Sequence, residues 1–253
     1  AMDLSSLQLI TYGAAPMPFE TVRRAIDAFD CGLMNAYGQT ESTSALTYLD
    51  PDDHRLDGTP EEVATKLKRL RSVGRPMSDV TIAILDAAGR EQPPGVEGEI
   101  CVRSARVMKD YLHQDEATAV ATAGGWLHTG DIGYLDEGGY LFITGRVKDL
   151  IIRGGENVSA GEIEAVLESH PAVEEAAVIG VPDPDWGEAV KAVVALRDGA
   201  TLEAEALQAY CKQRLASHKT PAYVAYVDAL PRNPMGKILK TDLRRDHGTA
   251  DNG

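Results

Sequence analysis

The chain has 253 residues, of which 43% are apolar and 25% charged, enough for one large or two ordinary domains with a buried core. The formal net charge of −14 argues against general nucleic-acid binding, because a polyanion is bound by a clustered basic surface. It leaves small nucleotides open, since a few well-placed Lys or Arg side chains can hold phosphates on an acidic protein.

Membrane insertion and secretion have no signal in the sequence. No apolar run approaches the roughly 20 residues of a membrane span, and the first residues lack the basic and apolar regions of a signal peptide. Cys31, Cys101 and Cys211 lie far apart, without a pairing pattern or the close spacing of a zinc site. We therefore expect buried thiols in a reducing, cytoplasmic compartment.

The first part of the chain has the order strand, turn, helix, strand. Residues 5–13 are expected to form a short buried strand, and residues 18–29 a helix with Pro18 in its first turn. A second strand leads into a glycine-containing loop at 37–42, and a charged helix is expected at about 61–70. This order predicts the end of an α/β layer over residues 1–71.

Residues 72–147 have a different character and are expected to form a β-rich subdomain. Short strand-like runs alternate with Gly, Pro and Asp: VTIAILD (80–86), GEICVRS (98–104), DIGYLD (131–136) and GYLFITG (139–145). Residues 136–139, Asp-Glu-Gly-Gly, favour a hairpin turn.

Residues 148–243 are expected to form a compact α+β domain. A strand at 150–155 precedes Ser159 and Glu162, whose spacing fits a capping box at the start of a helix. Two buried strands follow, then a second helix that Thr201 would cap, and a last strand at 222–230. Residues 244–253 are expected to be a polar tail, and Lys240 a surface charge.

Five segments stand out by their order and spacing. They are YGAAP (12–16), YGQTES (37–42), HTGD (128–131), GRVKDLIIRGGENVSAGEIE (145–164) and PRNPMGKILK (231–240). Together they resemble the adenylate-forming superfamily, which contains acyl-CoA synthetases, adenylation domains and firefly-type luciferases. The resemblance runs from about residue 4 to residue 243.

The resemblance implies the fold class and the domain limits. We expect the α/β and β-rich end of a large adenylate-forming N-terminal domain, the C-terminal part of an AMP-binding domain, over residues 1–147. A small, mobile α+β C-terminal domain would follow over residues 148–243.

The nucleotide-binding residues come from the resemblance. They are Gly13, Ala14, Ala15, Tyr37, Thr40, Asp131 and Arg146. Small residues let a flat adenine lie against the backbone, a single carboxylate can accept from both ribose hydroxyls, and a forked guanidinium suits ribose or phosphate oxygens. Trp126 and His128, which lie just before Asp131 in the sequence, are expected to be packing residues.

Four residues would act on the phosphates or on the movement of the small domain. Thr40 would hydrogen-bond a phosphate oxygen, and Glu41 offers a hard oxygen ligand for Mg²⁺. By resemblance Lys237 is the catalytic lysine, meeting the carboxylate and the α-phosphate as negative charge gathers. Lys148 takes the place of the hinge residue about which the small domain rotates.

Two glycine-containing segments bear on the other substrates. Gly154, Gly155 and Glu156 resemble the loop of acyl-CoA synthetases that admits the narrow pantetheine arm of coenzyme A. Short-chain members carry a tryptophan where this chain has Gly38, so the acyl pocket would be open to a longer aliphatic or an aromatic acid.

A full-length synthetase also carries a Gly/Ser/Thr-rich phosphate loop ending in lysine, ahead of the YGAAP segment. The sequence contains no such run, nor the G-x-x-x-x-G-K-[ST] pattern of other nucleotide-binding proteins. We therefore expect a fragment that does not turn over alone.

The sequence thus predicts part of an AMP-forming acyl-CoA synthetase. Its substrates would be a medium- or long-chain fatty acid, ATP with Mg²⁺, and coenzyme A. Three alternatives stay open: an aryl-CoA ligase of the 4-coumarate or benzoate type, an adenylation domain that loads a carrier protein, and a non-catalytic nucleotide-binding module. The oligomeric state has no signal in the sequence.

Overall fold

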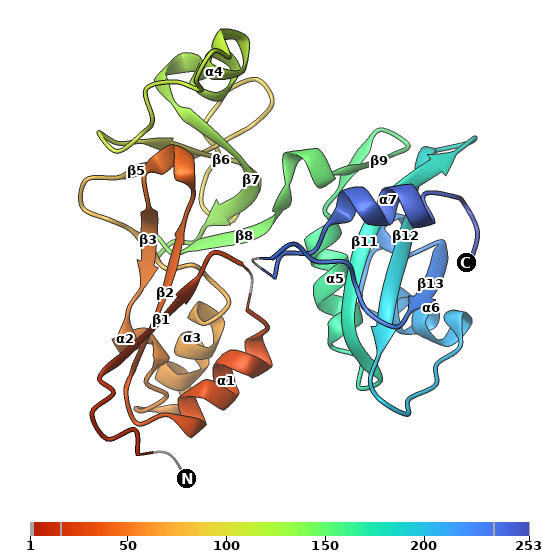
Figure 1. The fold of residues 1–253 in the computed structure, drawn as a ribbon, viewed down its shortest axis with the longest axis horizontal. Coiled ribbons are helices and arrows are strands. Elements are labelled where there is room, and N and C mark those ends of the chain that lie inside the picture. The colour runs from red at the N-terminus through yellow and green to blue at the C-terminus, as the bar shows by residue number, and fades with distance from the viewer. Residues whose placement is uncertain (1–2, 16, 235, 253) are drawn as a thin grey trace. The chain divides into compact units, whose positions relative to one another are not determined.

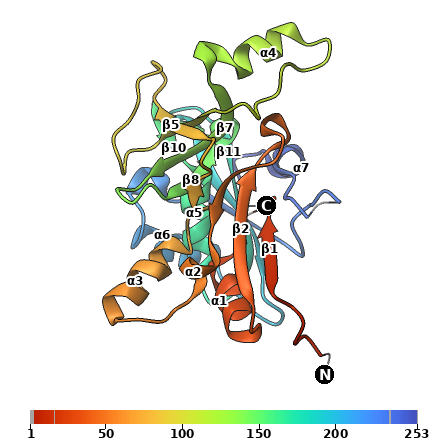
Figure 2. The same ribbon diagram turned by 90° about the vertical axis from the view of Figure 1, so that its left-hand side faces the viewer.

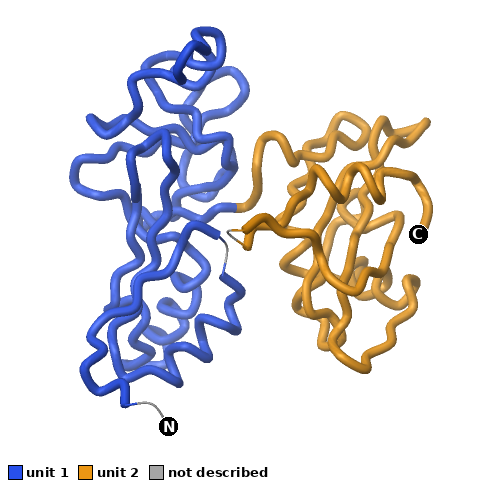
Figure 3. Tube along the Cα trace, viewed as in Figure 1, with its two compact units in different colours: residues 1–143 blue, residues 144–253 orange. Residues whose placement is uncertain are grey.

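The structure, a computed structural model, describes residues 3–15, 17–234 and 236–252. Pro16 of the YGAAP segment and Met235 of the last segment lie outside the described residues. The chain divides into unit 1, residues 1–143, and unit 2, residues 144–253 (Figure 3). Among the described residues, no helix has the length and apolar character needed to cross a membrane.

An α/β layer forms the first part of unit 1 (Figure 1). Its elements are β1 (Leu9–Gly13), α1 (Phe19–Ala28), β2 (Gly32–Gly38), η1 (Thr40–Ser42), β3 (Ala45–Leu49), α2 (Pro51–His54), α3 (Pro60–Arg69) and β4 (Arg75–Pro76). The sheet has the order β1-β2-β3-β4, with β1 and β2 parallel and α1 connecting them. The predicted strand–helix–strand order is therefore confirmed.

Helix α3 shows why these residues form a helix at this place. Thr59 precedes it, and its hydroxyl accepts from the Glu62 amide at 3.3 Å, while the Glu62 carboxylate accepts from the Thr59 amide at 2.7 Å. Pro60 then occupies the first helical position, where a missing amide costs nothing.

A β-rich part follows in unit 1. Its elements are β5 (Thr81–Leu85), β6 (Gly98–Arg103), α4 (Asp115–Ala121), η2 (Ala123–Gly125), β7 (Leu127–Leu135) and β8 (Leu141–Arg146), the last of which continues into unit 2. The strands lie in the order β5-β6-β7-β8 and bury a core of branched aliphatic side chains. Strands β5, β7 and β8 of this part are labelled in Figure 2. The predicted turn is confirmed, since the Asp136 carbonyl accepts from the Gly139 amide at 2.9 Å between β7 and β8.

Unit 2 is a five-stranded sheet with helices on both faces. Its elements are η3 (Val147–Asp149), β9 (Ile151–Arg153), β10 (Glu156–Val158), α5 (Ala160–Glu168), β11 (Val173–Asp183), β12 (Gly187–Leu196), α6 (Ala204–Lys212), η4 (Ser217–Lys219), β13 (Tyr223–Val227) and α7 (Lys240–His247). Helices α5 and α6 share one apolar core with the sheet, and Leu243 of α7 belongs to a second core.

Two predicted helix caps are wrong. Helix α5 begins after Ser159, but the Ser159 hydroxyl donates to the Thr144 carbonyl at 2.5 Å and makes no capping bond. Helix α6 begins at Ala204 with Glu203 at the N-cap, so Thr201 does not cap it. Ser159 is buried, and its hydroxyl is used by the Thr144 carbonyl, so it does not cap the helix.

The residues expected to be a polar tail are packed against unit 2. Helix α7 runs to His247, and the ammonium of Lys191, which is fully buried on β12, donates to the Thr249 carbonyl and to Asp251 Oδ1, both at 2.9 Å. Asn252 Oδ1 accepts from the Val224 amide on β13 at 3.0 Å. A buried ammonium needs a counter-charge, and these residues supply it.

Removing that counter-charge tests this account. We expect Asp251→Ala to lower the free energy of unfolding by about 1–3 kcal/mol, because Lys191 then stays buried without its counter-charge. The double variant Lys191→Met/Asp251→Ala should recover most of the loss. Asp246→Ala, which breaks an exposed pair with Arg245, is the matched control and should leave stability unchanged. Urea unfolding measures all three, and equal losses in Asp251→Ala and Asp246→Ala would contradict the account.

Candidate functional site

Two of the segments lie side by side at one edge of the first sheet. Strands β1 and β2 are parallel and in register from Leu9 opposite Gly32 to Gly13 opposite Ala36. Gly13, Ala14 and Ala15 therefore leave the sheet next to Tyr37, because the carboxyl ends of parallel strands meet at the same edge. Ala14 has a left-handed backbone, φ 63°, which is uncommon for a residue with a side chain.

Tyr12, which precedes Gly13, is fixed by a buried histidine. The Tyr12 hydroxyl and His54 Nε2 are 2.8 Å apart, and His54 Nδ1 lies 2.9 Å from the Asp50 carbonyl. Burial lowers the pKa of His54, which favours the neutral ring, whose Nε2 accepts a hydrogen bond from the Tyr12 hydroxyl. The turn at Gly13 thus starts from a well-supported strand.

Asp131 lies in a bulge of β7. Glu99 of β6 faces Ile132, and Cys101 faces His128, so residues 129–131 stand opposite Ile100 alone. Gly130 has φ 70°, a conformation that favours glycine. Asp131 is 3% exposed, and its Oδ2 accepts from the Tyr37 hydroxyl at 2.7 Å. The structure therefore brings together Tyr37 and Asp131, which are far apart in the sequence.

Thr40 and Glu41 form the short helix η1, directly after β2. Thr40 is exposed, and Glu41 is half-buried. Glu41 Oε1 accepts from the Tyr111 hydroxyl at 2.8 Å, and its carbonyl accepts from the Met108 amide at 2.7 Å. The bond to Glu41, followed by burial, raises the pKa of Tyr111, which keeps the hydroxyl as a donor. Glu41 is thus held in place by the segment that follows β6.

Gly38 is required by a close approach of two backbones. A Cβ at this position would lie 2.0 Å from the Ser44 carbonyl oxygen and 2.8 Å from the Ala45 Cα. No side chain fits there without moving the start of β3. The identity of Gly38 therefore has an explanation that does not involve an acyl pocket, and the pocket assignment stays a prediction.

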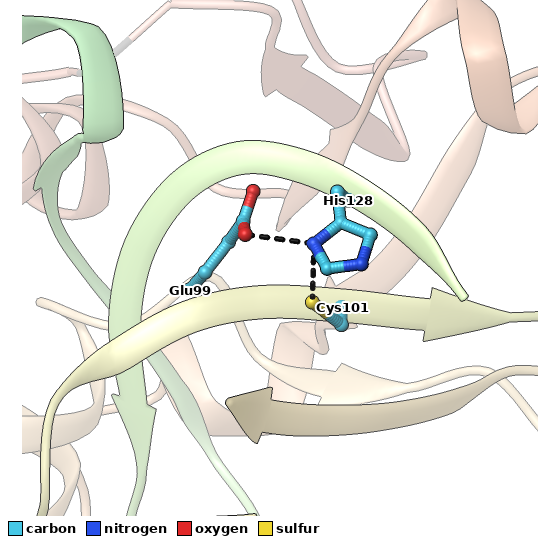
Figure 4. Close-up of side chains that lie close together, drawn as sticks. All are labelled: Glu99, Cys101 and His128. Atoms are coloured by element: carbon cyan, nitrogen blue, oxygen red, sulfur yellow. Dashed lines mark hydrogen bonds and ion pairs between the residues drawn. The ribbon is translucent and has the colours of Figure 1, made fainter. Parts of the chain in front are cut away.

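Glu99, Cys101 and His128 form a cluster between β6 and β7 (Figure 4). By residue type they suit a soft divalent metal. The contacts, however, are those of hydrogen bonds: Glu99 Oε2 lies 2.8 Å and Cys101 Sγ 3.5 Å from His128 Nδ1, and Glu99 Oε1 accepts from the Gly130 amide at 3.1 Å. Burial, and then the charge of Glu99, raises the pKa of Cys101 to about 12, which disfavours the thiolate that a metal requires.

Trp126, expected to be a packing residue, does pack in unit 1. It lies against the buried residues Ala83, Leu85 and Cys101, and Arg103 stacks over its ring at 3.9 Å. His128, the other expected packing residue, makes polar contacts instead, through the cluster with Glu99 and Cys101.

In unit 2, Gly154 and Gly155 form the turn between the paired strands β9 and β10, with φ of 60° and 86°. The turn borders an open pocket of about 450 Å³. Its lining residues are Arg153, Gly154, Glu156, Trp186, Ser217 and His218. Trp186 is 54% exposed and lies against Gly154, while Arg153 Nη1 donates to the His218 carbonyl at 2.8 Å.

Lys237 is exposed on a loop of unit 2 that is held at both ends. Before it, Arg232 pairs with Glu175 of β11; after it, Lys240 pairs with Glu164 of α5 at 2.6 Å. Asn233 closes the loop, because its Oδ1 accepts from the Lys237 amide at 2.9 Å. The expectation that Lys240 is a surface charge is wrong: its side chain is 17% exposed and ion-paired.

The remaining predicted residues lie where the chain enters unit 2. Arg146 ends β8 and is half-buried, and Lys148 is exposed in η3. The neighbouring Asp149 pairs with Arg244 of α7 at 2.9 Å, which ties η3 to the rest of unit 2.

Sequence reasoning missed three residues that support or line these sites: Glu99, Tyr111 and Trp186. Trp186 had a signal, since a tryptophan in a polar turn of Asp, Pro and Gly is rarely buried. Glu99 and Tyr111 had none, because the groups they contact lie 31 and 70 residues away.

The comparisons with known proteins agree with this arrangement. The AMP-binding enzyme family matches residues 1–112, and the AMP-binding enzyme C-terminal domain matches residues 162–237. The chain belongs to the AMP-binding enzymes. The predicted resemblance to the adenylate-forming superfamily is confirmed, and so is the predicted fold class.

Relatives of this AMP-binding chain differ in their named reactions. The chain is 39% identical to the fatty acid–[acyl-carrier-protein] ligase ScoC of Streptomyces coeruleorubidus, over 96% of this chain and 45% of that protein. It is 42% identical to the 2-succinylbenzoate–CoA ligase of Geobacillus kaustophilus, over 96% of this chain and 46% of that protein. The chain spans just under half the length of these relatives.

The chain is also similar to part of a solved structure, the amide bond synthetase McbA from Marinactinospora thermotolerans. It superposes with a TM-score of 0.85 at 40% identity, covering 96% of this chain and 48% of that chain.

The cysteines offer a test of the packing around the cluster. At pH 8 we expect a thiol reagent to label Cys31, which is partly exposed, while Cys101 and Cys211 stay unlabelled. Burial raises the pKa of these two thiols to about 12 and about 11, so roughly one Cys101 in ten thousand is a thiolate at pH 8. All three should react in urea. Labelling of Cys101 in the folded Cys31→Ser variant at the rate of an exposed thiol would contradict this.

Proposed function

We propose that the protein containing this chain activates a carboxylic acid with ATP and passes the acyl group to coenzyme A. A carboxylate oxygen attacks the α-phosphorus, forming acyl-AMP and releasing diphosphate. The thiol of coenzyme A then attacks the acyl carbonyl, losing its proton, and AMP leaves. The observation that carries the proposal is the buried Asp131–Tyr37 pair at the carboxyl edge of β1 and β2, in a chain of the AMP-binding family.

The nucleotide would lie against this edge. Gly13, Ala14 and Ala15 would border the adenine, and Asp131 would accept from the ribose hydroxyls. Tyr37 supports this role, since its hydroxyl already orients the Asp131 carboxylate. Arg146 would approach the ribose or the phosphates as a fixed positive charge.

Mg²⁺ fits the carboxylate of Glu41. The group is an oxygen ligand of the kind that Mg²⁺ prefers, it is half-buried, and Tyr111 fixes one of its oxygens. Bound there with ATP, Mg²⁺ would neutralise phosphate charge. Thr40 would donate its hydroxyl to a phosphate oxygen from the same turn of η1.

Lys237 would stabilise the negative charge that gathers at the α-phosphate. Its exposed loop is held by the ion pairs of Arg232 and Lys240, so the ammonium is carried on a supported but accessible turn. Lys148 would serve as the hinge of the predicted small domain, residues 148–243, whose limits remain part of the proposal.

Coenzyme A would use the pocket beside Gly154, Gly155 and Glu156. Trp186 offers an exposed aromatic face for the adenine or the pantetheine arm of coenzyme A, and the glycine turn leaves room for a narrow chain. Arg153 borders the same pocket and would favour an anionic ligand.

For the acid we propose a medium- or long-chain fatty acid, on the resemblance of the YGQTES segment and residues 145–240 to bacterial fatty-acid–CoA ligases and on the named substrate of ScoC. An aromatic acid is the alternative favoured by the 2-succinylbenzoate ligase. Loading of a carrier protein is a second candidate function, because ScoC is named for that acceptor.

We also propose that residues 1–253 alone do not complete the reaction, since the chain spans just under half of its relatives. The cytoplasm stays the proposed compartment, with three unpaired thiols.

The role of Lys237 can be tested by separating the half-reactions in the complete gene product. Lys237→Ala should slow acyl-adenylate formation by about 100-fold or more, because charge stabilisation at the transition state is lost. Thioester formation from added acyl-AMP should change little. Lys212→Ala, which removes an exposed lysine of α6, is the control. Equal losses in both half-reactions would remove Lys237 from this role.

The acceptor can be tested at Trp186. With coenzyme A, Trp186→Ala should raise KM about tenfold, and Trp186→Phe should restore most of it, since the aromatic face is kept. Adenylate formation, followed by diphosphate exchange, should stay unchanged in both. Faster acyl transfer to a phosphopantetheinyl carrier protein than to coenzyme A would favour the carrier-loading function instead.

A further inference from the structure

We propose that Glu99 is a positioning residue that holds the β7 bulge in the shape that presents Asp131. The inference rests on the proposed role of Asp131 at the ribose. Glu99 lies on the neighbouring strand β6, and nothing in its local sequence marks it as part of a nucleotide site.

The bulge requires support from outside the strand ladder. Because residues 129–131 face a single residue of β6, regular pairing is interrupted there. Side chains supply the replacement: the Thr129 hydroxyl donates to the Ile100 carbonyl at 2.7 Å and accepts from the Asp131 amide at 3.1 Å, while Glu99 Oε1 accepts from the Gly130 amide at 3.1 Å. Glu99 is the charged member of this set, and charge-assisted bonds are the stronger ones.

The second carboxylate oxygen of Glu99, Oε2, holds the side chain so that Oε1 points at the Gly130 amide. Oε2 lies 2.8 Å from Nδ1 of His128, the residue that leads into the bulge. Figure 4 shows the two side chains facing each other. One carboxylate therefore bridges His128 and Gly130, on either side of Thr129. The Glu99 side chain is 26% exposed, so these bonds compete with little bulk water.

Asp131 follows Gly130 directly, so the position of the Gly130 peptide determines where the Asp131 carboxylate points. Tyr37 fixes that carboxylate from β2, and Glu99 fixes its backbone from β6. A ligand hydroxyl that needs both oxygens of Asp131 in one place would lose affinity if the peptide moved by even an ångström.

The experiment compares two nucleotides in the complete gene product by calorimetry: AMP and 2′,3′-dideoxy-AMP, which lacks the ribose hydroxyls. Wild type should prefer AMP. Glu99→Ala should weaken AMP about tenfold and leave dideoxy-AMP unchanged. Glu99→Gln should recover most of the preference, because its amide oxygen still accepts from the Gly130 amide, the bond that supports the bulge. Glu97→Ala, which removes an exposed glutamate two residues away, should behave as wild type.

Asp131→Ala separates failure of the inference from failure of the proposed function. Loss of the preference in Asp131→Ala but not in Glu99→Ala would overturn the positioning role alone. An unchanged preference in Asp131→Ala, or no AMP binding by wild type, would overturn the proposed ribose site. Equal weakening of both nucleotides by Glu99→Ala would make Glu99 merely structural, and so overturn the inference.

A measurement without nucleotide completes the test. In this chain, amide exchange at Gly130 should be at least tenfold faster in Glu99→Ala than in wild type or Glu97→Ala, because its acceptor is gone. Unchanged exchange at Gly130 would overturn the inference whatever the nucleotide results.

Discussion

Unit 1 depends on a carboxylate that is almost entirely removed from water. Asp131 is 3% exposed, and a buried carboxylate persists only where donors meet it. Tyr37 is one such donor, and it comes from the other sheet of the unit, so a single bond of 2.7 Å ties the end of β2 to the bulge of β7. The candidate residues at the edge of β1 and β2 and those on β7 are therefore one structure, although 94 residues separate Tyr37 from Asp131.

In unit 2 the buried charge is an ammonium on β12, and it too requires partners within the protein. Lys191 is fully buried on this strand, and the residues after α7 fold back to pair with it. Two more cations, Arg232 and Lys240, are held by glutamates of β11 and α5. The pairs of Arg232 and Lys240 bracket the loop of Lys237, so acidic side chains fix cations on both sides of that loop.

Sequence patterns predicted the elements that are determined by residues within one short segment. The strand–helix–strand start and the turn at 136–139 could be predicted, because the residues within each short segment determine whether it forms a strand, a helix or a turn. Three of the misses share one cause. Ser159 bonds Thr144, Lys191 bonds Asp251, and Lys240 pairs with Glu164, so each side chain is used by a distant partner that no local pattern reveals. Helix α4 was missed because a seven-residue segment carries little periodicity. The five segments identified the family, while the supports of the site, Glu99 and Tyr111, lay outside them.

The candidate residues differ in how they are supported, and this difference has a chemical meaning. Asp131 and Glu41 are buried or half-buried and bonded to tyrosines, which suits groups that must hold a nucleotide and its metal in one geometry. Lys237, Gly154 and Gly155 are exposed on turns whose flanking residues are clamped. A turn with fixed flanking residues keeps its shape while its tip stays accessible. This suits a group that contacts its ligand in only one of the two half-reactions. The acyl-CoA synthetase proposed here needs both kinds of support in one chain, because adenylate and thioester formation share a nucleotide but not a nucleophile.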